Sequence, residues 1–488
     1  MSERQLLVGP FNRVEGDLEV HLDVRDGVVQ SARVNATMYR GFEQMLPGKA
    51  PDDALVYVPR ICGICSVSQS VAAALALRDA AGAHAEPMPD NGRHAINVML
   101  AVENLADHLT HFYLFFMPDF ARDTYRARPW FDTVHTRFAP LQGSHARQAT
   151  AARQRWFTLL GTLGGKWPHT QAIQPGGVTR PIDTAERLRL LTKVRELRDF
   201  LEQTLFAAPL DVVNAWGSEA DMLQWWQAGP ADAGDLRCFL QVSADLGLDR
   251  LGPGPGRLLS FGTYTQPDGS QALPGGVWEA DAQRELDAGQ ITEDATHAWL
   301  HGHAPVHPAQ GLTQPDADKP QAYTWNKAPR LGGQIAETGA IARQVLAGHP
   351  VVRDAVQRLG ATVHTRVLAR VLELARVLPW VEQWLLALRP GQAWHAPAPW
   401  PDEASGVGLS EAARGALGHW LRIHQGRLAH YQIVAPTSWN FSPRDGQGQP
   451  GPLEQALVGT PVQDNEDTPV AVQHVVRSFD PCMVCTVH

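Results

Sequence analysis

The first repeating pattern along the chain is an alternation of apolar and polar residues near the N-terminus. Within residues 17–35, an apolar residue stands at every second position from Leu18 to Val24, which is typical of a β-strand with one buried face. Asp26-Gly27 interrupts the alternation, and an Asp-Gly pair between two such stretches favours a tight turn. The pattern predicts a β-hairpin over 17–35.

Longer segments follow the 3.6-residue period of a helix. Residues 67–82 and 91–117 carry this period, and 91–117 is apolar around much of its circumference, which predicts a helix buried in the core. The amphipathic stretch 182–207 starts with Asp183 or Thr184 as a possible N-cap and is expected on the surface of a bundle. Helical periodicity returns at 333–347, 351–389 and 410–430.

Between the helical regions the composition changes. From 252 to 330 the chain is rich in Gly and Pro, with strand-like pieces at 257–264 and 276–279, which indicates a loop-rich excursion with short strands. The tail over 431–488 is again expected to be rich in loops. Because no internal repeat or linker divides the chain, we expect a single domain over 1–488. Its predicted class is α+β, mainly helical, with a large central helical bundle and small peripheral β elements.

Composition and charge narrow the possible functions. The 488 residues include 51 acidic and 42 basic side chains, and a net charge of −9 gives no footprint for nucleic acid. Hydrophobic residues make up 44% of the chain, yet no apolar run reaches the roughly 18 residues of a membrane-spanning helix. The first residues lack the pattern of a signal peptide. These features predict a cytoplasmic chain with no direct membrane span.

Four of the five cysteines form two CxxC pairs, Cys62/Cys65 and Cys482/Cys485, at opposite ends of the chain. Two thiolates at this spacing can bind one metal ion, so a shared metal would join the N- and C-terminal ends. One CxxC alone could also be a redox pair, half of a zinc site or a chance occurrence. A structural zinc site therefore stays open as an alternative. Cys238 lies in an apolar stretch and is expected to be a small buried residue.

The cysteine motifs, RICGIC at 60–65 and DPCMVCTVH at 480–488, resemble those of the large subunit of nickel-iron hydrogenases. The resemblance covers essentially the whole chain and keeps the family's order of motifs. It includes RVEG at 13–16, RGFE at 40–43, DHLTHFY at 107–113, KAPR at 327–330 and VAPTSWN at 434–440. A member of this family would cleave dihydrogen heterolytically into protons and electrons.

The resemblance implies a nickel-iron centre whose iron carries carbon monoxide and cyanide. By position, Cys65 and Cys485 would bridge the two metals, whereas Cys62 and Cys482 would bind nickel only. Soft thiolates suit nickel, and a thiolate sulfur keeps lone pairs with which it can bind a second metal.

The resemblance also assigns residues around this centre. Glu15 would accept the proton that leaves by way of Cys482, because a buried metal site needs an ionisable relay. Arg330 would lie above the open metal position, held by Asp107 and Asp480. A buried guanidinium and its carboxylates tolerate desolvation only as a network, so these three residues are expected to act together.

Further matches concern bound ligands and a second ion. Thr437 and the backbone near Pro436 correspond to groups that hydrogen-bond a cyanide ligand. Glu43 and His488 correspond to ligands of a magnesium-type ion near the C-terminus, with the carbonyl of Ile433 as a weaker third. A hard cation prefers carboxylate, carbonyl and water oxygens, so an imidazole ligand is unusual for it.

Some positions depart from the family pattern. Gln69 stands four residues after Cys65, where family members typically have a histidine, and glutamine cannot titrate near neutral pH. Ile64 and Phe112 are bulkier than the Val and Leu of many relatives and would narrow a gas channel. The sequence stops at His488, where most large subunits are made with a further tail. An already trimmed form is one alternative, but the missing tail and Gln69 together resemble the regulatory subgroup, which lacks the tail, senses dihydrogen and reports to a histidine kinase.

Partners follow from the same argument. No cysteine cluster remains to hold iron-sulfur clusters, so we expect an obligate small subunit that carries them, together with maturation proteins that insert nickel and iron. The alternative within the family is an energy-conserving uptake hydrogenase. Alternatives of another class are a structural zinc protein and a quinone-module subunit of respiratory complexes. The latter shares the fold but has lost the metal-binding cysteines, which are all present here.

Overall fold

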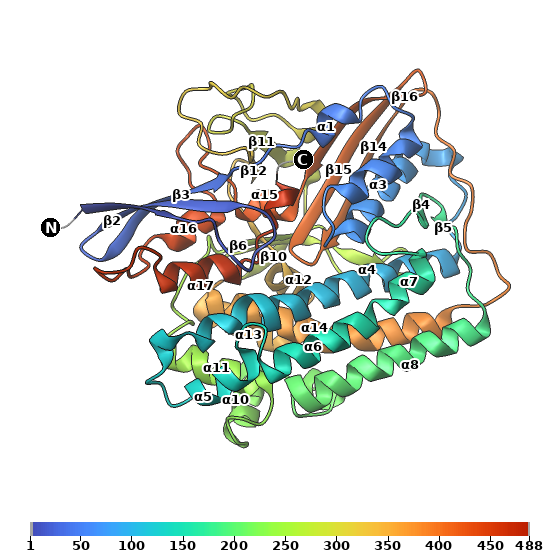
Figure 1. Ribbon diagram of the computed structural model, residues 1–488. Coiled ribbons are helices and arrows are strands. Elements are labelled where there is room, and N and C mark those ends of the chain that lie inside the picture. The colour runs from blue at the N-terminus through green and yellow to red at the C-terminus, as the bar shows by residue number, and fades with distance from the viewer. Residues whose placement is uncertain (1–2, 487–488) are drawn as a thin grey trace.

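A bundle of long helices forms the centre of the computed structural model, which describes residues 3–486. In the lower half of Figure 1, α4 (Asp90–Thr110) and α14 (Val363–Ala387) lie side by side, and α6 (Ser144–Trp156) and α8 (Thr184–Phe200) pack around them. Small β elements surround this bundle. The predicted α+β class, mainly helical, is confirmed.

The two best-defined helix predictions hold in detail. Nearly every residue of α4 is buried, as its apolar circumference predicts, and the helix continues as a π-helical stretch, η4 (His111–Phe116). The α8 helix starts after Asp183, whose side chain accepts a hydrogen bond from the backbone N–H of Glu186, so Asp183 is the N-cap.

The N-terminal strands form a three-stranded antiparallel sheet that extends to the left in Figure 1. β1 (Glu3–Val8) pairs with β2 (Leu18–Arg25), and β2 turns at Asp26-Gly27 into β3 (Val28–Ala36). The apolar face of the hairpin is buried, and β3 packs against α16 (Pro452–Leu457).

Short strands also fill the region rich in Gly and Pro. β6 (Arg257–Ser260), β9 (Gly276–Glu279), β10 (Ala282–Arg284) and β13 (Glu337–Thr338) form one sheet, and two small pairs complete the region. These pairs are β7 (Thr263–Thr265) with β8 (Gln271–Leu273), and β11 (Ile291–Asp294) with β12 (Ala328–Leu331).

The helix predicted over 410–430 is wrong. This segment forms an antiparallel sheet of β14 (Ala404–Ala412), β15 (Gly415–His424) and β16 (Arg427–Val434). Most of β15 is buried on both faces, because α3 (Ser66–Ala81) packs on one side, so its apolar residues do not alternate and imitate a helical period. The missed signal is Gln425-Gly426, where both residues have positive φ, the backbone of a tight hairpin turn.

Other helix predictions need smaller corrections. Of 333–347 only α12 (Ala340–Leu346) is helical, and 351–389 is divided between α13 (Pro350–Leu359) and α14. The tail contains α15 (Pro436–Asn440), α16 and α17 (Val470–Ser478) as well as loops. The remaining helices and strands are α1 (Phe42–Met45), α2 (Ala54–Tyr57), α5 (Phe131–Phe138), α7 (Thr158–Gly164), α9 (Leu210–Asn214), α10 (Glu219–Gln227), α11 (Asp235–Leu246), β4 (Ile173–Gln174) and β5 (Gly177–Val178).

The two ends of the chain meet inside the fold. Met483 donates a backbone hydrogen bond of 2.7 Å to the carbonyl of Glu15, whose own N–H donates to Pro481 at 3.3 Å. Gly16 has a φ of +79°, and a Cβ there would lie 3.0 Å from the backbone nitrogen of Val484. Glycine is therefore required where the N-terminal segment approaches the C-terminal one.

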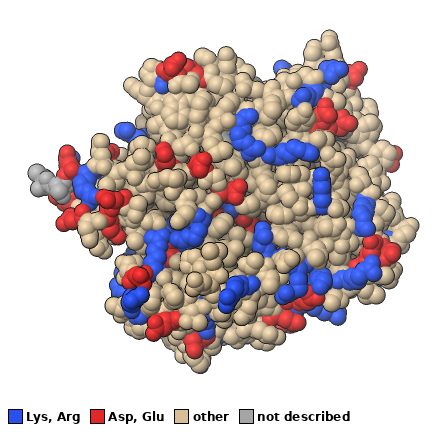
Figure 2. All heavy atoms as spheres, viewed as in Figure 1, with Lys and Arg blue, Asp and Glu red and all other residues tan. Residues whose placement is uncertain are grey.

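The surface carries charges of both signs. On the face shown in Figure 2, Lys and Arg side chains are interspersed with Asp and Glu. Within residues 3–486, none of the helices combines the length and the apolar character that crossing a membrane demands.

Candidate metal centre

Four buried thiols gather where the two ends of the chain meet. The Cys62 and Cys65 side chains lie just before α3, and Cys482 and Cys485 lie around the short turn η10 (Met483–Cys485). All four sulfur atoms lie within 4.8 Å of one another, with closest separations of 3.0, 3.2 and 3.4 Å. These separations far exceed a disulfide bond of about 2.05 Å, so the cysteines are free thiols. Four sulfur donors converging on one point fit a soft transition metal.

The electrostatics of the cluster favour charge on at least one sulfur. Hydrogen bonds from the other three thiols, Cys482 foremost, hold the pKa of Cys62 well below its usual range. Burial raises the pKa of Cys482. A thiolate is the form that binds a metal, so the cluster is prepared for a cation.

Glu15 lies beside this cluster. It belongs to the segment that pairs with Cys482, and its carboxyl is partly buried. Burial raises the pKa of Glu15, the nearby Cys62 raises it further, and Arg414 opposes both. A carboxyl with a raised pKa close to a thiolate is suited to accept and release a proton.

The guanidinium next to the cluster belongs to Arg414, and the prediction for Arg330 is wrong in this respect. Arg414, in the turn between β14 and β15, contacts Asp107 at 3.1 Å and Asp480 at 3.0 Å. Burial lowers the pKa of Arg414, but the two aspartates, followed by Cys482 and Cys62, raise it more strongly. The predicted network of one arginine and two aspartates therefore exists with a different arginine.

Arg330 holds a loop instead. Its Nε donates to Asp445 at 2.9 Å, and one Nη donates to the carbonyl of Gln449 at 2.9 Å. β12 carries Arg330 in a sheet with β11, so its side chain fixes the chain after α15. The signal for Arg414 was hidden, because it lies in the segment mistaken for a helix.

The backbone at Asp480 is strained. Its φ of +57° lies in the left-handed region, which is costly for a residue other than glycine, by roughly 1–3 kcal/mol. Arg414 Nε donates to the carbonyl of Asp480 at 2.9 Å and so holds this conformation. Burial would raise the pKa of Asp480, but Arg414 and His111 lower it, whereas burial raises the pKa of Asp107.

Two of the residues matched to ligand contacts lie at the cluster. Thr437, in α15, is buried, and its hydroxyl accepts a hydrogen bond of 3.2 Å from the backbone N–H of Cys482. Pro436 begins the same helix and is buried as well.

A second polar cluster lies next to the centre, around Glu43 and Lys327. One carboxylate oxygen of Glu43 accepts the backbone N–H of Ile433 at 2.7 Å, and Thr313 donates a hydrogen bond to the other. Lys327 Nζ lies 3.0 Å from Glu293. Burial alone would lower the pKa of Lys327, but Glu293 and Glu43 reverse this and raise it.

This second cluster borders a cavity of about 10 Å³, roughly the space that one water or small ion occupies, and its lining combines the oxygen atoms of Glu43, Glu293 and Thr313 with the Lys327 ammonium and apolar side chains. An oxygen-rich site fits a hard divalent cation. The cluster also includes Gln432, whose amide oxygen accepts from Lys327 at 2.8 Å. His488, predicted as a ligand here, lies outside the described residues.

Comparison with known proteins identifies the family. The sequence profile described as nickel-dependent hydrogenase matches residues 40–127 and 235–488. The chain is similar to the periplasmic [NiFeSe] hydrogenase large subunit of Desulfomicrobium baculatum, with 30% identity over 99% of this chain and 95% of that protein. The chain belongs to the nickel-dependent hydrogenase family.

Other relatives agree with this assignment. The hydrogenase-1 large chain of Escherichia coli is 29% identical, and the uptake hydrogenase large subunit of Rhodobacter capsulatus is 26% identical, each over 99% of this chain and 95% of the relative. The structure of the H2-activated [NiFeSe] hydrogenase from Dm. baculatum matches with a TM-score of 0.86 and 29% identity, covering both chains fully. The protein is thus a hydrogenase large subunit, an oxidoreductase with a nickel-iron centre. A structural zinc protein and a quinone-module subunit are no longer supported.

Gln69 differs from the histidine expected of a hydrogenase, and the structure shows what it contacts. Its amide oxygen lies 2.8 Å from Nε2 of His419, on β15, and Nδ1 of that ring lies 2.8 Å from the Tyr431 hydroxyl. All three side chains are buried. An imidazole is therefore present near the expected place, but it is the ring of His419, which contacts the Gln69 side chain.

Of the two predicted gas-channel residues, only Ile64 is seen in contact with a cysteine of the centre. Ile64 is half-buried, and its backbone N–H donates to the sulfur of Cys62 at 3.3 Å. Phe112 is buried in η4 with its ring edge-on to Phe239. Their effect on gas access remains a prediction.

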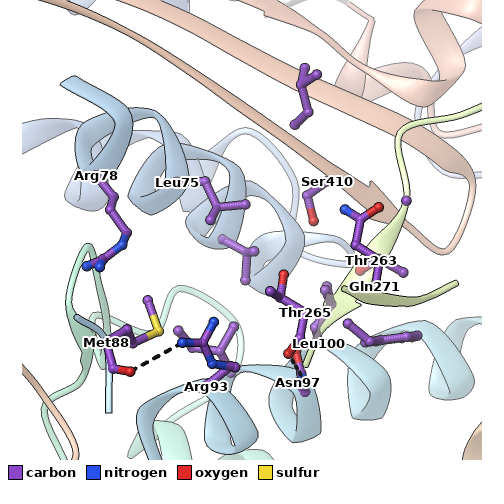
Figure 3. A pocket seen from close by; sticks show the side chains of 15 residues that line it. Leu75, Arg78, Met88, Arg93, Asn97, Leu100, Thr263, Thr265, Gln271 and Ser410 are labelled. Carbon is purple, nitrogen blue, oxygen red and sulfur yellow. Dashed lines mark hydrogen bonds between the residues drawn. The ribbon is translucent and has the colours of Figure 1, made fainter. Parts of the chain in front are cut away.

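One cavity of about 210 Å³ lies away from the thiols, between α3, α4 and the β7/β8 pair. Figure 3 shows Arg78 and Arg93 on one side and Thr263 and Gln271 on the other, with Arg93 donating a hydrogen bond to the Met88 carbonyl. Neither Ile64 nor Phe112 lines this cavity.

Proposed function

We propose that this hydrogenase subunit cleaves dihydrogen at the four-cysteine site and that Glu15 and Arg414 act beside it. One observation carries the proposal. The four buried thiols lie beside the Glu15 carboxyl, whose pKa is raised, and the Arg414 guanidinium, which two aspartates fix. Nickel and iron bound by the cysteines would supply the electrophilic centre that polarises dihydrogen.

Each group of the chain then has a stated task. Glu15 accepts the proton through Cys482, because its raised pKa brings it closer to neutrality than an ordinary carboxyl. Arg414, not Arg330, presents its positive charge toward the open side of the cluster. The burial of the thiols excludes water from the reaction.

The finer composition of the centre belongs to the same proposal. Cys62 and Cys482 would hold nickel, Cys65 and Cys485 would hold both nickel and iron, and the iron would carry carbon monoxide and cyanide. Thr437 and the backbone at Pro436 lie against Cys482 and are suited to contact a cyanide. A magnesium-type ion is proposed near Glu43 and the Ile433 carbonyl, where the oxygen-rich cluster supports it, with His488 as a further ligand.

Electrons must leave through another subunit. Among residues 3–486 the only group of cysteines is the one already described, and Cys238 is buried and accepts a hydrogen bond from Arg137. We therefore propose an iron-sulfur small subunit as obligate partner, and maturation proteins that load the metals. If the isolated, fully loaded chain reduced a dye as fast as the complex, this partner proposal would be wrong.

The decisive test is an infrared spectrum of the purified complex in the region of metal-bound carbon monoxide and cyanide. We expect bands that shift when dihydrogen is added. Absence of bands, with zinc found by elemental analysis, would contradict the proposed function.

Two physiological roles remain for the same chemistry. Gln69 supports a dihydrogen sensor that reports to a histidine kinase, because a neutral amide stands where family members typically have a titratable histidine. The similarity to the R. capsulatus uptake hydrogenase supports the alternative, an uptake enzyme. A sensor would turn over slowly and change kinase phosphorylation with dihydrogen, whereas an uptake enzyme would turn over fast and leave phosphorylation unchanged. A cytoplasmic location goes with the sensor role and stays a prediction.

A further inference from the structure

Glu103, a carboxylate that no sequence motif singles out, fixes the chain directly after Cys65. Glu103 lies on α4, is 2% exposed, and accepts the backbone N–H groups of Val67 and Ser68, each at 2.8 Å. The Ser68 hydroxyl donates at 2.9 Å, and the Trp167 indole N–H donates at 3.0 Å. These donors include the first turn of α3, so the carboxylate fixes the position at which α3 leaves the metal centre.

A second carboxylate of α4 points to the other half of the centre. Asp107 follows Glu103 by four residues, which places both side chains on one face of the helix, a single turn apart. Asp107 contacts Arg414, and Arg414 holds Asp480 through its side chain and its carbonyl. Asp480 stands two residues before Cys482. One face of α4 is therefore connected to both cysteine pairs.

We propose that Glu103 and Asp107 together form a clamp that sets the distance between the two cysteine pairs. The pairs come from opposite ends of the chain, and no covalent bond fixes their separation. A helix buried in the core is stiff, so two carboxylates one turn apart fix two positions relative to each other. Both are positioning residues, and the inference deepens the proposed function of the site and rests on it.

The charge and shape of Glu103 are specific to this task. Four hydrogen bonds of 3.0 Å or less, all from neutral donors, converge on its two oxygens, and an ionised carboxyl has acceptor sites for all of them. Glutamine at this position would turn its NH2 group toward an N–H or O–H donor. The substitution Glu103→Gln therefore keeps the volume and breaks the contacts on one oxygen.

The test compares Glu103→Gln with a matched control in the complete complex. Glu454 is also buried, also accepts backbone N–H groups, those of Val34 and Gly451, and burial raises the pKa of each carboxyl to about 7. Unlike Glu103, it bonds to no residue of the turn after Cys65. The readouts are nickel content and the infrared frequencies of the diatomic ligands, which respond to the geometry of the bridging thiolates.

We expect Glu103→Gln to weaken nickel retention by roughly tenfold to 100-fold, as the loss of outer-sphere support does in other sites, and to shift or broaden the infrared bands. Glu454→Gln should leave both unchanged. Ser68→Ala, which removes one donor and keeps the fold, should shift the bands in the same direction and by less. Bands in the wild type that Glu103→Gln and Ser68→Ala leave unchanged would overturn the clamp. Absence of bands in the wild type would instead overturn the proposed function.

Discussion

Two polar regions lie on either side of the last described turn of the chain, and they differ in their donor atoms. The sulfur region is made of the four cysteines with Glu15 and Arg414, and the oxygen region of Glu43, Glu293 and Lys327. Cys485 belongs to the first and the next residue, Thr486, lines the second. The fold thus places a cluster of sulfur donors and a cluster of oxygen donors one peptide unit apart.

The two regions also treat charge differently. Lys327 neutralises the oxygen region with direct contacts to two carboxylates. In the sulfur region, Glu15 has a raised pKa, and Cys62 adds to that shift. The sulfur region therefore contains a carboxyl of raised pKa, whereas the carboxylates of the oxygen region are paired with a buried cation. Four changes test this contrast.

The largest effect is expected for Cys482→Ser. A hydroxyl is a poor ligand for nickel, so the variant should lose nickel and all dihydrogen-dependent activity. Elemental analysis and a hydrogen-uptake assay measure both. Cys238→Ser is the control and should retain the metals, and equal nickel in the two variants would contradict the assignment of the site.

Glu15→Gln should have the next largest effect. The amide cannot accept the proton, so turnover should fall by roughly 10² to 10⁴-fold. Nickel content should stay at the wild-type level, because Glu15 is not proposed as a ligand. Wild-type turnover in this variant would show that the proton leaves by another path.

Arg414→Lys should reduce turnover by roughly 10²-fold or more, since a lysine cannot contact both aspartates with a planar fork. Arg330→Lys is the matched control, because Arg330 is equally buried yet pairs with Asp445. The ratio of the two rates measures which arginine serves the centre. If Arg330→Lys were the slower enzyme, the original assignment from the motif would be restored.

Lys327→Met tests the oxygen region and should have the smallest effect on chemistry. Removing the cation takes away the buried positive charge that Glu43 and Glu293 share, which costs about 3–5 kcal/mol of stability. The pKa of Lys327 is raised above 10.5, so its stabilising effect is full below pH 10.5 and is lost as the pH rises through the raised value. Thermal unfolding of the wild type and of Lys327→Met should be measured from neutral pH to above pH 10.5. The difference in their stability should shrink at high pH, and nickel content should be the same in both.

Much of the site could be predicted from the sequence, because ligand spacing is local. The CxxC pairs have the spacing of metal ligands, Glu15 was assigned by the resemblance to the hydrogenase family, and the structure brings them together. The buried helix α4 was predictable for a similar reason, since its period is read from neighbouring residues.

The contacts that depend on tertiary packing could not be predicted. Arg414 was missed because β15 is covered on both faces and imitates a helix, so its turn went unrecognised. Glu103 was missed because its partners on α3 and at Trp167 are distant in sequence, and a lone glutamate within a helical period has no distinguishing mark. For both Arg414 and Glu103, the spacing of residues along the chain does not reveal which side chains or backbone groups they contact.

The pairing of Glu15 with Met483 has a consequence for how the protein is made. On the ribosome, Cys62 and Cys65 emerge long before Cys482 and Cys485. The backbone hydrogen bonds of Glu15 to Pro481 and Met483 cannot form until those last residues have been made. A nascent chain therefore has only half of the sulfur ligands. Metal insertion is confined to the time after translation has reached the last cysteine, and an incomplete chain cannot capture nickel in the finished geometry.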